Sequence, residues 1–281
     1  MDIAAARTFL AIVDAGNFVS ASRRLHVTQS TVSARIRALE EVFGKPLFIR
    51  TKAACELTPA GRRFYRHART IVREWEEARH QLAVPPDYDD HLAIGGQYSL
   101  WSHYLLDWLA RIEDVAPKCS VHASIGMPDR LMQQLVDGVL DLAVMYDPQY
   151  RPGLVVEQIF DDTLVLVSAG DDDATAPRSQ VFVDWGEAFR KWHGAQFDDW
   201  GMPGLTLALG SVGIGYLIDA KKSGYFPQRI AAPYIANGEL RRLDAPQFDY
   251  PVYAVYQAEE AVAALMRPLL ADLKRFSRAH A

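Results

Sequence analysis

Short hydrogen-bonding side chains and one arginine gather between Thr28 and Arg37. Gln29, Ser30 and Ser33 supply amide and hydroxyl groups, and Arg37 follows one helical turn later. Amides and hydroxyls can hydrogen-bond to base edges in the DNA major groove, and arginine can bind guanine or phosphate. These residue types therefore favour recognition of DNA. An ordinary amphipathic surface helix is the alternative that the segment alone leaves open.

A helix must hold these side chains on one face. Apolar residues recur in the segment at the spacing of a narrow helical stripe: Val32, Ile36, Leu39 and Phe43. Thr28 or Ser30 can cap the start of this helix, and Gly44 can end it. The polar residues then lie on the face away from the stripe, where they are free to meet a partner.

The flanking segments complete a DNA-binding pattern. Residues 3–13 carry a first helical face, residues 18–25 are typical of a short helix, and residues 26–28 form a tight turn. A short helix, a turn and a longer polar-faced helix make a helix-turn-helix. Residues 46–52 and 56–58 indicate two short strands with a basic tip. Such a wing would contact the DNA backbone or the minor groove.

The pattern is specific enough to resemble a known family. Matching residues occur in register over some fifty positions: Phe9-Leu10, Ala21-Ser22, Leu25, Val27-Thr28-Gln29-Ser30, Val32-Ser33, Ile36-Arg37, Leu39-Glu40, Gly44, Leu47-Phe48, Arg50 and Leu57-Thr58-Pro59-Ala60-Gly61. With these residues, positions 1–84 resemble the winged helix-turn-helix of the LysR-type transcriptional regulators. Arg35-Ile36-Arg37, together with later Trp-Gly features, resembles a branch of that family that includes a flagellar-operon repressor.

The resemblance implies which residues meet DNA: Thr28, Gln29, Ser30, Thr31, Ser33, Arg35, Arg37, Arg50 and Lys52. Two positions depart from the family pattern. The family often has arginine where this chain has Ala34, and a second wing arginine where it has Ala53. Arg35 and Lys52 lie next to these positions, and we expect them to compensate.

Charge is divided unevenly along the chain. Residues 1–69 hold 12 Lys and Arg against 5 Asp and Glu, whereas the remainder holds 18 against 30. The overall net charge of −5 therefore combines +7 with −12. A basic N-terminal module joined to an acidic body suits a nucleic-acid binder with a separate sensor domain.

A long helix is expected over residues 59–84, where Thr58 serves as N-cap and Pro59 takes the first helical position. Its apolar residues follow the 4-3 spacing of a heptad seam: Phe64, Ala68, Ile71, Trp75, Ala78 and Leu82. This spacing favours association between two chains, with packing onto the chain's own core as the alternative. In the resembled family this helix is the linker and dimer contact.

A different organisation begins after the proline-rich hinge of residues 85–90. Residues 91–95, 120–125 and 140–145 read as strands, with helices over 100–115 and 129–139 between them. This βαβαβ order implies a parallel sheet. Further strands are expected at 164–168, 181–183, 206–209 and 251–256, a loop leading into a helix at 210–218, and a closing helix over 261–277.

The expected architecture has four parts. Residues 1–58 form an all-α winged helix-turn-helix, residues 59–84 a linker and dimerisation helix, and residues 85–90 a hinge. Residues 91–281 form an α/β effector domain, which the family resemblance implies is a two-lobed, periplasmic-binding-protein-like clamshell. Lobe I covers about 91–163 and 252–281, and lobe II about 164–251.

An effector site is expected where loops leave the strands of the two lobes. Ligands of open α/β sheets lie beyond the carboxyl ends of strands, against helix N-termini. Three loops qualify, at residues 96–100, 126–128 and 210–213, and two helix N-termini converging there would favour a small carboxylate. The candidate residues are Tyr98, Ser99, Leu100, Met127, Ser168, Trp185, Gly210 and Ser211. For Ser99, capping of the following helix is an equal alternative.

Two further features have competing interpretations. Trp185, Trp192 and Trp200 stand within sixteen residues and could wall a pocket, although core and lobe-interface packing is the alternative. Asp161-Asp162 and Asp171-Asp172-Asp173 read as solvated acidic turns.

Other classes of protein are disfavoured. There is no Gly-x-Ser-x-Gly, His-Glu-x-x-His or Walker lysine motif, and the eight histidines lack metal-ligand spacing. We therefore expect no enzyme activity, no metal and no cofactor. No apolar run approaches 18 residues and no leader pattern opens the chain, which predicts a cytoplasmic protein without membrane contact. Cys55 and Cys119 read as reduced bystanders, with redox sensing as the alternative.

The sequence thus predicts a transcriptional regulator. Its expected partners are double-stranded DNA, further copies of itself in a dimer or tetramer, and a small-molecule effector, with RNA polymerase as a further candidate. The alternative from another class is a ligand-binding clamshell whose N-terminal helices mediate only protein contacts. An enzyme with a diffuse active site is the third.

Overall fold

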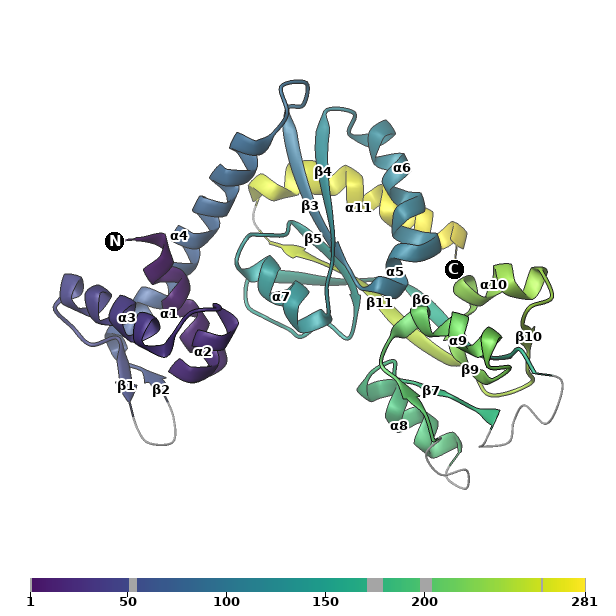
Figure 1. Cartoon of the computed structure of the whole chain (residues 1–281). Helices are drawn as coiled ribbons and strands as arrows, with labels where there is room; N and C mark the ends of the chain where they lie inside the picture. Colours follow the sequence, from purple (N-terminus) through teal and green to yellow (C-terminus); the bar gives the residue numbers. More distant parts are fainter. Residues whose placement is uncertain (1, 51–54, 171–178, 198–203, 259, 281) are drawn as a thin grey trace. The chain divides into compact units, whose positions relative to one another are not determined.

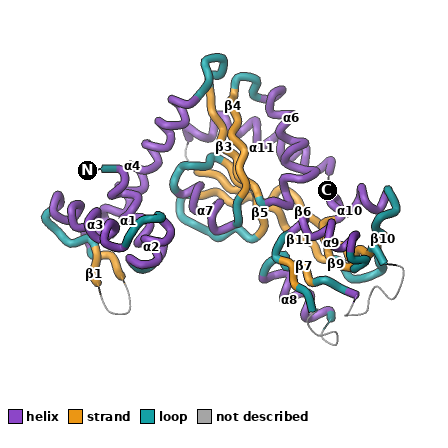
Figure 2. The backbone as a smooth tube through the Cα atoms, viewed as in Figure 1, coloured by secondary structure: helices purple, strands orange, loops and turns teal. Residues whose placement is uncertain are grey.

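The computed structural model describes residues 2–50, 55–170, 179–197, 204–258 and 260–280. Contacts divide the chain into two compact units, Met1–His91 with Gln133–Leu140, and Leu92–Met132 with Asp141–Ala281. Figure 1 labels the elements of both units, and Figure 2 separates helices from strands by colour. Helices dominate the first unit, and the second combines helices with a large sheet.

The helix-turn-helix is formed by α1 (Ile3–Ala15), α2 (Phe18–Arg24) and α3 (Gln29–Phe43). Thr28 caps α3 by accepting a hydrogen bond from the Thr31 N–H, and Gly44 ends it in the left-handed conformation. Val32, Ile36 and Leu39 are fully buried, which confirms the apolar stripe. Phe43 remains 43% exposed.

The wing consists of β1 (Phe48–Arg50) and β2 (Cys55–Leu57), an antiparallel pair in which Phe48 faces Leu57. The long helix α4 (Pro59–Ala83) follows. Thr58 joins wing and helix, since its hydroxyl accepts from the Gly61 N–H at 2.9 Å and donates to the Pro46 carbonyl at 2.8 Å. Both elements were expected, but the wing tip with Lys52 and Ala53 lies outside the described residues.

Aromatic packing holds this unit together. The Phe9 ring of α1 lies 5.0 Å from Phe48 of the wing and 4.9 Å from Phe64 of α4, centroid to centroid. Phe43, at the end of α3, lies 5.0 Å from Phe64. One apolar core therefore fixes the recognition helix, the wing and the start of α4 relative to one another.

A seven-stranded sheet organises the second unit. Its strands are β3 (Asp90–Gly96), β4 (Cys119–Ile125), β5 (Leu142–Tyr146), β6 (Leu154–Ser168), β9 (Ser223–Pro227), β10 (Arg241–Arg242) and β11 (Phe248–Gln257). The order is β10-β6-β11-β5-β3-β4, and β9 also pairs with β6. β3 and β5 are parallel, as the βαβαβ pattern predicts.

Two long strands connect the two ends of this sheet. Residues 154–164 of β6 pair antiparallel with residues 248–257 of β11, and Figure 1 shows the two strands side by side. β5 and β3 extend the sheet beyond β11, whereas β9 pairs only with the last five residues of β6. β7 (Phe182–Val183) and β8 (Thr206–Leu207) form a small parallel pair. This arrangement agrees with two lobes joined by crossing strands, and the exact lobe boundaries stay a prediction.

The helices of the effector domain are α5 (Tyr98–Leu100), the π-helical turn η1 (Trp101–Leu105), α6 (Leu106–Val115), α7 (Pro128–Val136), α8 (Glu187–Gln196), the 3-10 turn η4 (Gly210–Val212), α9 (Gly213–Asp219), α10 (Gln228–Ala236) and α11 (Glu260–His280). The continuous helix expected over 100–115 is wrong. Ser102 is extended, with ψ 129°, and His103 is left-handed, with φ 56°. The helix is therefore kinked in its second turn.

The interpretation of Asp161-Asp162 as an acidic turn is also wrong. Both residues lie within β6, which begins ten residues earlier than the strand expected at 164–168. Asp162 is buried because a charged partner from α10 reaches it. The triad 171–173 lies outside the described residues.

An aromatic cluster fills the interior around α8. Trp192 packs on Phe189, Tyr225 and Phe248, which supports core packing over a pocket wall for this tryptophan. Trp200 lies outside the described residues. His193 sits in the same cluster, with Phe182, Phe189, Phe197 and Tyr225 rings at centroid distances of 4.8–6.0 Å.

We expect His193 to make the fold acid-sensitive. Burial lowers the pKa of His193, so the folded chain resists a proton that the unfolded chain accepts. Stability is then retained above the ordinary histidine pKa of about 6.5 and falls as the pH drops below it toward the lowered folded value. Urea unfolding between pH 5 and 7 should show a shallower pH dependence in His193→Phe. In the control His122→Phe, which changes an exposed histidine, the wild-type dependence should persist.

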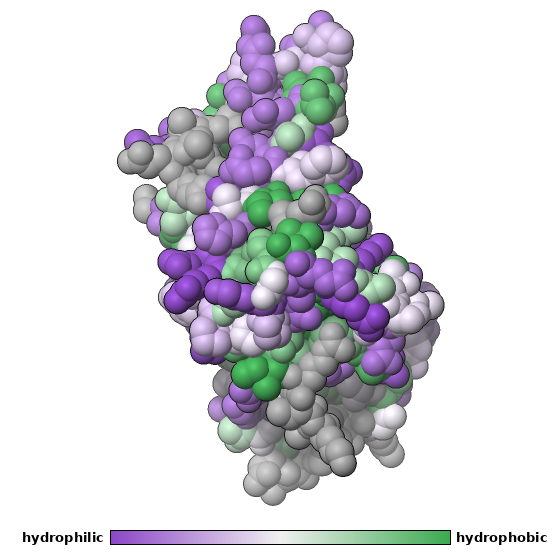
Figure 3. All heavy atoms as spheres, turned by 90° about the vertical axis from the view of Figure 1, so that its left-hand side faces the viewer, coloured by the Kyte–Doolittle hydropathy of each residue, from purple (hydrophilic) through white to green (hydrophobic). Residues whose placement is uncertain are grey.

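Exposed apolar side chains are scattered over both units. Figure 3 shows small hydrophobic patches among hydrophilic residues on one face. Among the described residues, no single helix has the length and hydropathy to cross a membrane. The helices α1 and α2 meet both criteria only when they are taken together, and the chain bends by 119° between them.

Candidate functional site

The recognition face of α3 is open to a partner. Gln29, Ser30 and Arg37 are exposed, and Ser33 is half-buried on the same side. The Thr28 hydroxyl lies 2.8 Å from both the Ser30 and the Thr31 hydroxyl oxygens. The start of α3 therefore presents a connected group of hydroxyls, and the long side chains of Gln29 and Arg37 project beyond it.

Arg35 is placed differently from the expectation. Its guanidinium donates to the Thr8 hydroxyl of α1 at 3.3 Å, and the side chain is half-buried. This hydrogen bond holds the end of the Arg35 side chain against α1. Ala34 is exposed on the recognition face, and Arg35 does not replace an arginine there.

Glu40 ties the wing to the recognition helix, a role that the sequence did not suggest. Its Oε1 accepts hydrogen bonds from the backbone N–H groups of Leu47 at 2.7 Å and Phe48 at 3.3 Å. These donors start the first wing strand, so the carboxylate fixes where β1 begins. Arg50 pairs with Cys55 in the wing, although the Arg50 side chain and Lys52 are outside the described residues.

The expected seam of α4 divides into two parts. Phe64 and Ala68 are buried in the core of their own chain, which corrects their assignment to a contact between chains. Further along, Ile71 is half-buried and Ala78 is exposed, and Trp75 and Leu82 are 47% and 89% exposed. The free part of the seam is therefore Ile71, Trp75, Ala78 and Leu82.

The three loops expected around the effector meet in the structure. The Gly126 N–H donates to the Gly96 carbonyl at 3.1 Å, and the Trp101 indole donates to the carbonyls of Gly96 and Ser124. α5 lies against η4, which brings the 96–100 loop to the 210–213 loop. A Cβ at Gly210 would lie 3.9 Å from the Trp185 ring.

Most of the candidate effector residues border this junction. Tyr98 is half-exposed and Met127 is 71% exposed, which leaves both able to touch a small molecule. Ser99 and Ser211 are buried. The Ser211 Oγ has no hydrogen-bond partner among the described residues, and an unpaired buried hydroxyl is unfavourable unless something binds it.

Three candidates are already engaged in the fold. Leu100 is wholly buried and its N–H donates to the Gln97 carbonyl, so it is a core residue. The Ser168 hydroxyl bonds the backbone of Gly170 in a local turn at the end of β6. Trp185 is buried, with its indole donating to the Tyr225 carbonyl at 2.9 Å, and one edge of its ring lies beside Gly210.

The expected pair of helix N-termini is weaker than the sequence suggested. α5 is a single turn that ends in the kink at Ser102–His103, and α9 has only seven residues behind η4. Short, interrupted helices do not build a large end dipole. Individual polar groups, rather than helix dipoles, must therefore bind any anion.

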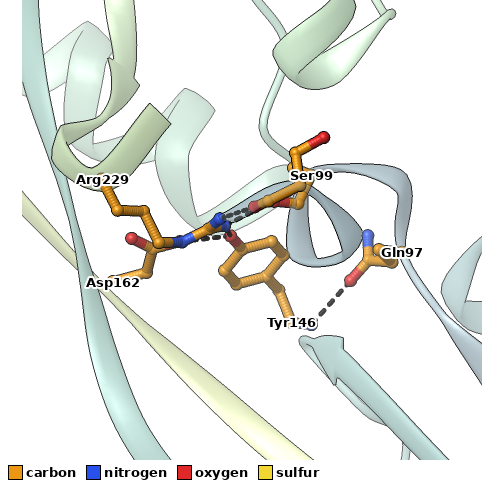
Figure 4. Close-up of polar contacts among 6 residues, drawn as sticks. Gln97, Ser99, Tyr146, Asp162 and Arg229 are labelled. Carbon is orange, nitrogen blue, oxygen red and sulfur yellow. Dashed lines mark hydrogen bonds and ion pairs between the residues drawn. The ribbon is translucent and has the colours of Figure 1, made fainter. Parts of the chain in front are cut away.

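A buried ionic cluster beside Ser99 was missed by the sequence. Figure 4 shows Arg229 between Asp162, the hydroxyl of Tyr146 and the main chain of Ser99. Burial alone would lower the Arg229 pKa, but the Asp162 carboxylate raises it overall. Burial also raises the Tyr146 pKa, so its phenol stays protonated. The only sequence signal was an acidic residue on the same strand face as Phe160 and Leu164.

Gln97 and Tyr250 extend these contacts. The Gln97 Oε1 accepts from the Tyr146 N–H at 2.6 Å, and the rings of Tyr146 and Tyr250 stack at 4.2 Å. The Tyr250 hydroxyl donates to Asp147 at 2.8 Å and contacts the Trp185 carbonyl at 2.6 Å. The loops after β3, β5 and β7 are thus linked through side chains from distant parts of the sequence.

Comparison with known proteins agrees with both units. A family model described as bacterial regulatory helix-turn-helix protein, lysR family, matches residues 3–62, and one described as LysR substrate binding domain matches residues 87–181. The HTH-type transcriptional regulator HdfR of Yersinia enterocolitica is 28% identical over 285 residues, covering 96% of this chain and 95% of that protein. The resemblance expected from the sequence, with its branch, is confirmed.

Solved structures share the whole architecture. ArgP from Mycobacterium tuberculosis superposes with a TM-score of 0.60 at 21% identity, over 99% of this chain and 97% of that one. Full-length LysG from Corynebacterium glutamicum with bound effector Arg gives 0.57 at 22% identity, over 98% of both chains. These similarities confirm the fold class, a helical DNA-binding unit followed by an α/β effector domain.

Proposed function

Because the chain belongs to the LysR family of bacterial transcriptional regulators, we propose that it reads its operator through Gln29, Ser30, Ser33 and Arg37. The observation that carries this proposal is the exposed polar face of α3, opposite a fully buried apolar stripe. The basic balance of residues 1–69 adds attraction to phosphates that does not depend on sequence. In this proposal the protein acts by binding and not by catalysis.

The proposed DNA-binding form is a dimer joined through the free part of the α4 seam. Two recognition helices would then enter successive major grooves, about 34–36 Å apart. Tetramers would carry two such pairs, and RNA polymerase is a further proposed partner. Residues of the wing would add backbone contacts, with Glu40 holding β1 in place beside α3.

Arg37→Ala tests this reading of the operator. If Arg37 binds a base, its loss should weaken operator binding by about 1–3 kcal/mol and relax specificity at one position. Binding should be measured by gel shift with operator and scrambled DNA over a range of salt concentrations. Arg130→Ala, at an exposed arginine of α7, is the control and should bind as wild type. Equal losses on operator and scrambled DNA would instead make Arg37 a phosphate contact.

We propose that the effector binds where the 96–100, 126–128 and 210–213 loops meet. Support comes from the Ser211 hydroxyl, which has no partner among the described residues, and from the exposed side chains of Tyr98 and Met127. LysG, which has the same fold, contains arginine as its bound effector. A small molecule bearing a carboxylate would satisfy the Ser211 hydroxyl, and its apolar part would contact Tyr98 and Met127.

Isothermal titration of the whole chain tests the effector site. A panel of amino acids and organic acids, including L-arginine, L-lysine and benzoate, should contain a ligand whose affinity falls about tenfold in Ser211→Ala, the loss of one hydrogen bond to a charged group. Ser168→Ala is the control, since its hydroxyl is engaged in a local turn. A ligand whose affinity is untouched by both Ser211→Ala and Ser99→Ala binds elsewhere. If no panel member binds, the domain serves assembly alone.

The proposed response follows from the two strands that join the lobes. A ligand changes the arrangement of the lobes only if it binds one arrangement more tightly than another. Closure about β6 and β11 would alter how dimers associate, and with it the spacing of their recognition helices.

A further inference from the structure

Arg229 joins parts of the effector domain that belong to different lobes in the expected division. It is the second residue of α10, directly after β9, and its side chain is only 10% exposed. Its Nε and Nη2 donate to Asp162 Oδ2 at 3.0 and 2.9 Å. The Tyr146 hydroxyl donates to the same oxygen at 2.6 Å. Three donors from two further elements thus converge on one carboxylate oxygen.

The same guanidinium also holds main-chain carbonyls. Nη2 donates to the Ser99 carbonyl at 2.5 Å, and Nη1 donates to the Ser102 carbonyl at 2.7 Å. A regular helix would direct these carbonyls along its axis to later N–H groups. The extended Ser102 and left-handed His103 interrupt that ladder, and Arg229 supplies the donors instead. The kink and the arginine are therefore complementary.

The geometry depends on the shape of arginine and not only on its charge. All three guanidinium nitrogens donate, to a carboxylate on one side and to two carbonyls on another. A lysine ammonium could retain the ion pair with Asp162, but its single nitrogen cannot span these separated acceptors. Because Asp162 neutralises Arg229, the arginine is suited to positioning the loop and not to attracting an anionic ligand.

We propose that Arg229 is a positioning residue that holds the Tyr98–Leu105 segment from the other lobe, so that the candidate effector loop and α10 move together. This inference rests on the proposed effector site for its biological role. Ser99, whose carbonyl Arg229 binds, borders that site, and a ligand there would act directly on a segment held by lobe II. The contacts of Arg229 with the Ser99 and Ser102 carbonyls provide a route from ligand binding to lobe arrangement in addition to the connecting strands β6 and β11.

Hydrogen exchange of the full-length chain, without effector, tests the link. In Arg229→Lys and Arg229→Met, amides of residues 98–106 should exchange about tenfold faster, as expected for loss of local stability. Tyr146→Phe is a matched variant, because it removes the hydrogen bond to Asp162 and a longer one, at 3.4 Å, from Arg229 Nη2, but leaves both carbonyl contacts. It should lower the thermal midpoint and leave exchange in 98–106 at the wild-type rate. Arg242→Met changes an exposed arginine that contacts Gln228 and should alter neither.

Spin labels measure lobe motion in the same variants. Labels at Glu113 of α6 and Lys191 of α8, both exposed, report the separation of the lobes once Cys55 and Cys119 are changed to serine. The distance distribution should broaden in Arg229→Lys and Arg229→Met and remain unchanged in Tyr146→Phe. An unchanged distribution in both arginine variants would overturn the proposal. So would faster exchange spread equally over 98–106 and α11, because that pattern indicates general destabilisation.

These two measurements use no effector, so they separate this inference from the proposed ligand site. If the titrations find no ligand but residues 98–106 loosen in Arg229→Lys, the link holds and the effector site fails. If a ligand binds through Ser211 but Arg229→Lys behaves as wild type, the site holds and the link fails.

Discussion

Leu82→Glu should convert the protein to monomers and abolish operator binding. Leu82 is 89% exposed in the single chain, so the substitution removes little packing within it. In the proposed dimer the same side chain would enter an apolar seam with Trp75 and Ala78. An unpaired charge there would cost about 3–5 kcal/mol. Light scattering should report the mass of one chain, and gel shifts should show no operator complex at concentrations that saturate wild type.

Gln81→Glu is the matched control for this prediction. It adds the same charge one residue away at an exposed position outside the seam, where it also removes a surface hydrogen bond to Glu77, and it should remain dimeric. Ile71→Glu should also give monomers, although Ile71 is half-buried within its own chain and the change would lower stability as well. A dimeric Leu82→Glu that binds operator would exclude this face of α4 as the contact between chains.

Gly61→Ala should displace the wing and weaken DNA binding. A Cβ at Gly61 would lie 2.2 Å from the Leu47 carbonyl oxygen and 2.9 Å from the Leu57 side chain. The first contact is with backbone, so the wing strands or α4 must shift. We expect the free energy of unfolding to fall by about 1–3 kcal/mol. Binding of operator and of scrambled DNA should weaken to the same extent.

Gly215→Ala provides the comparison for Gly61→Ala. Gly215 lies in α9, and a Cβ there would have nothing within 4 Å. Replacing a helical glycine with alanine in open space should stabilise the chain by about 0.5–1 kcal/mol. Thermal unfolding of the two variants should therefore shift in opposite directions. A Gly61→Ala protein as stable as wild type would show that the wing accommodates the methyl group.

The N-terminal unit was largely predictable because its signals are local. A stripe at helical spacing, a threonine cap and a terminal glycine all act within α3, and Thr58 and Pro59 mark α4 in the same way. The heptad spacing of α4 could not show which of its apolar residues are buried in the core of their own chain and which remain exposed. Phe64 is covered by Phe9 and Phe43, which lie far from it in the sequence.

The effector domain was less predictable because its key contacts are long-range. β9 contains Gly224 and Pro227, and α10 contains Pro233, so local patterns argued against both elements. Gly224 packs closely on a neighbouring segment of the chain, because a Cβ there would lie 3.1 Å from the Val181 carbonyl oxygen. The cluster around Arg229 joins positions up to 130 residues apart, and no spacing in the sequence reveals it.

Glu40 reduces the conformational entropy that the wing loses when the protein binds DNA. Its carboxylate already accepts hydrogen bonds from two amides at the start of the wing. A loop that becomes ordered only on DNA loses conformational freedom at that moment, and this loss is subtracted from affinity. A wing already fixed beside α3 loses little. In the proposed complex, more of the free energy from contacts between the wing and phosphates then remains as affinity, and the described wing strands are already positioned relative to α3 before the protein meets its operator.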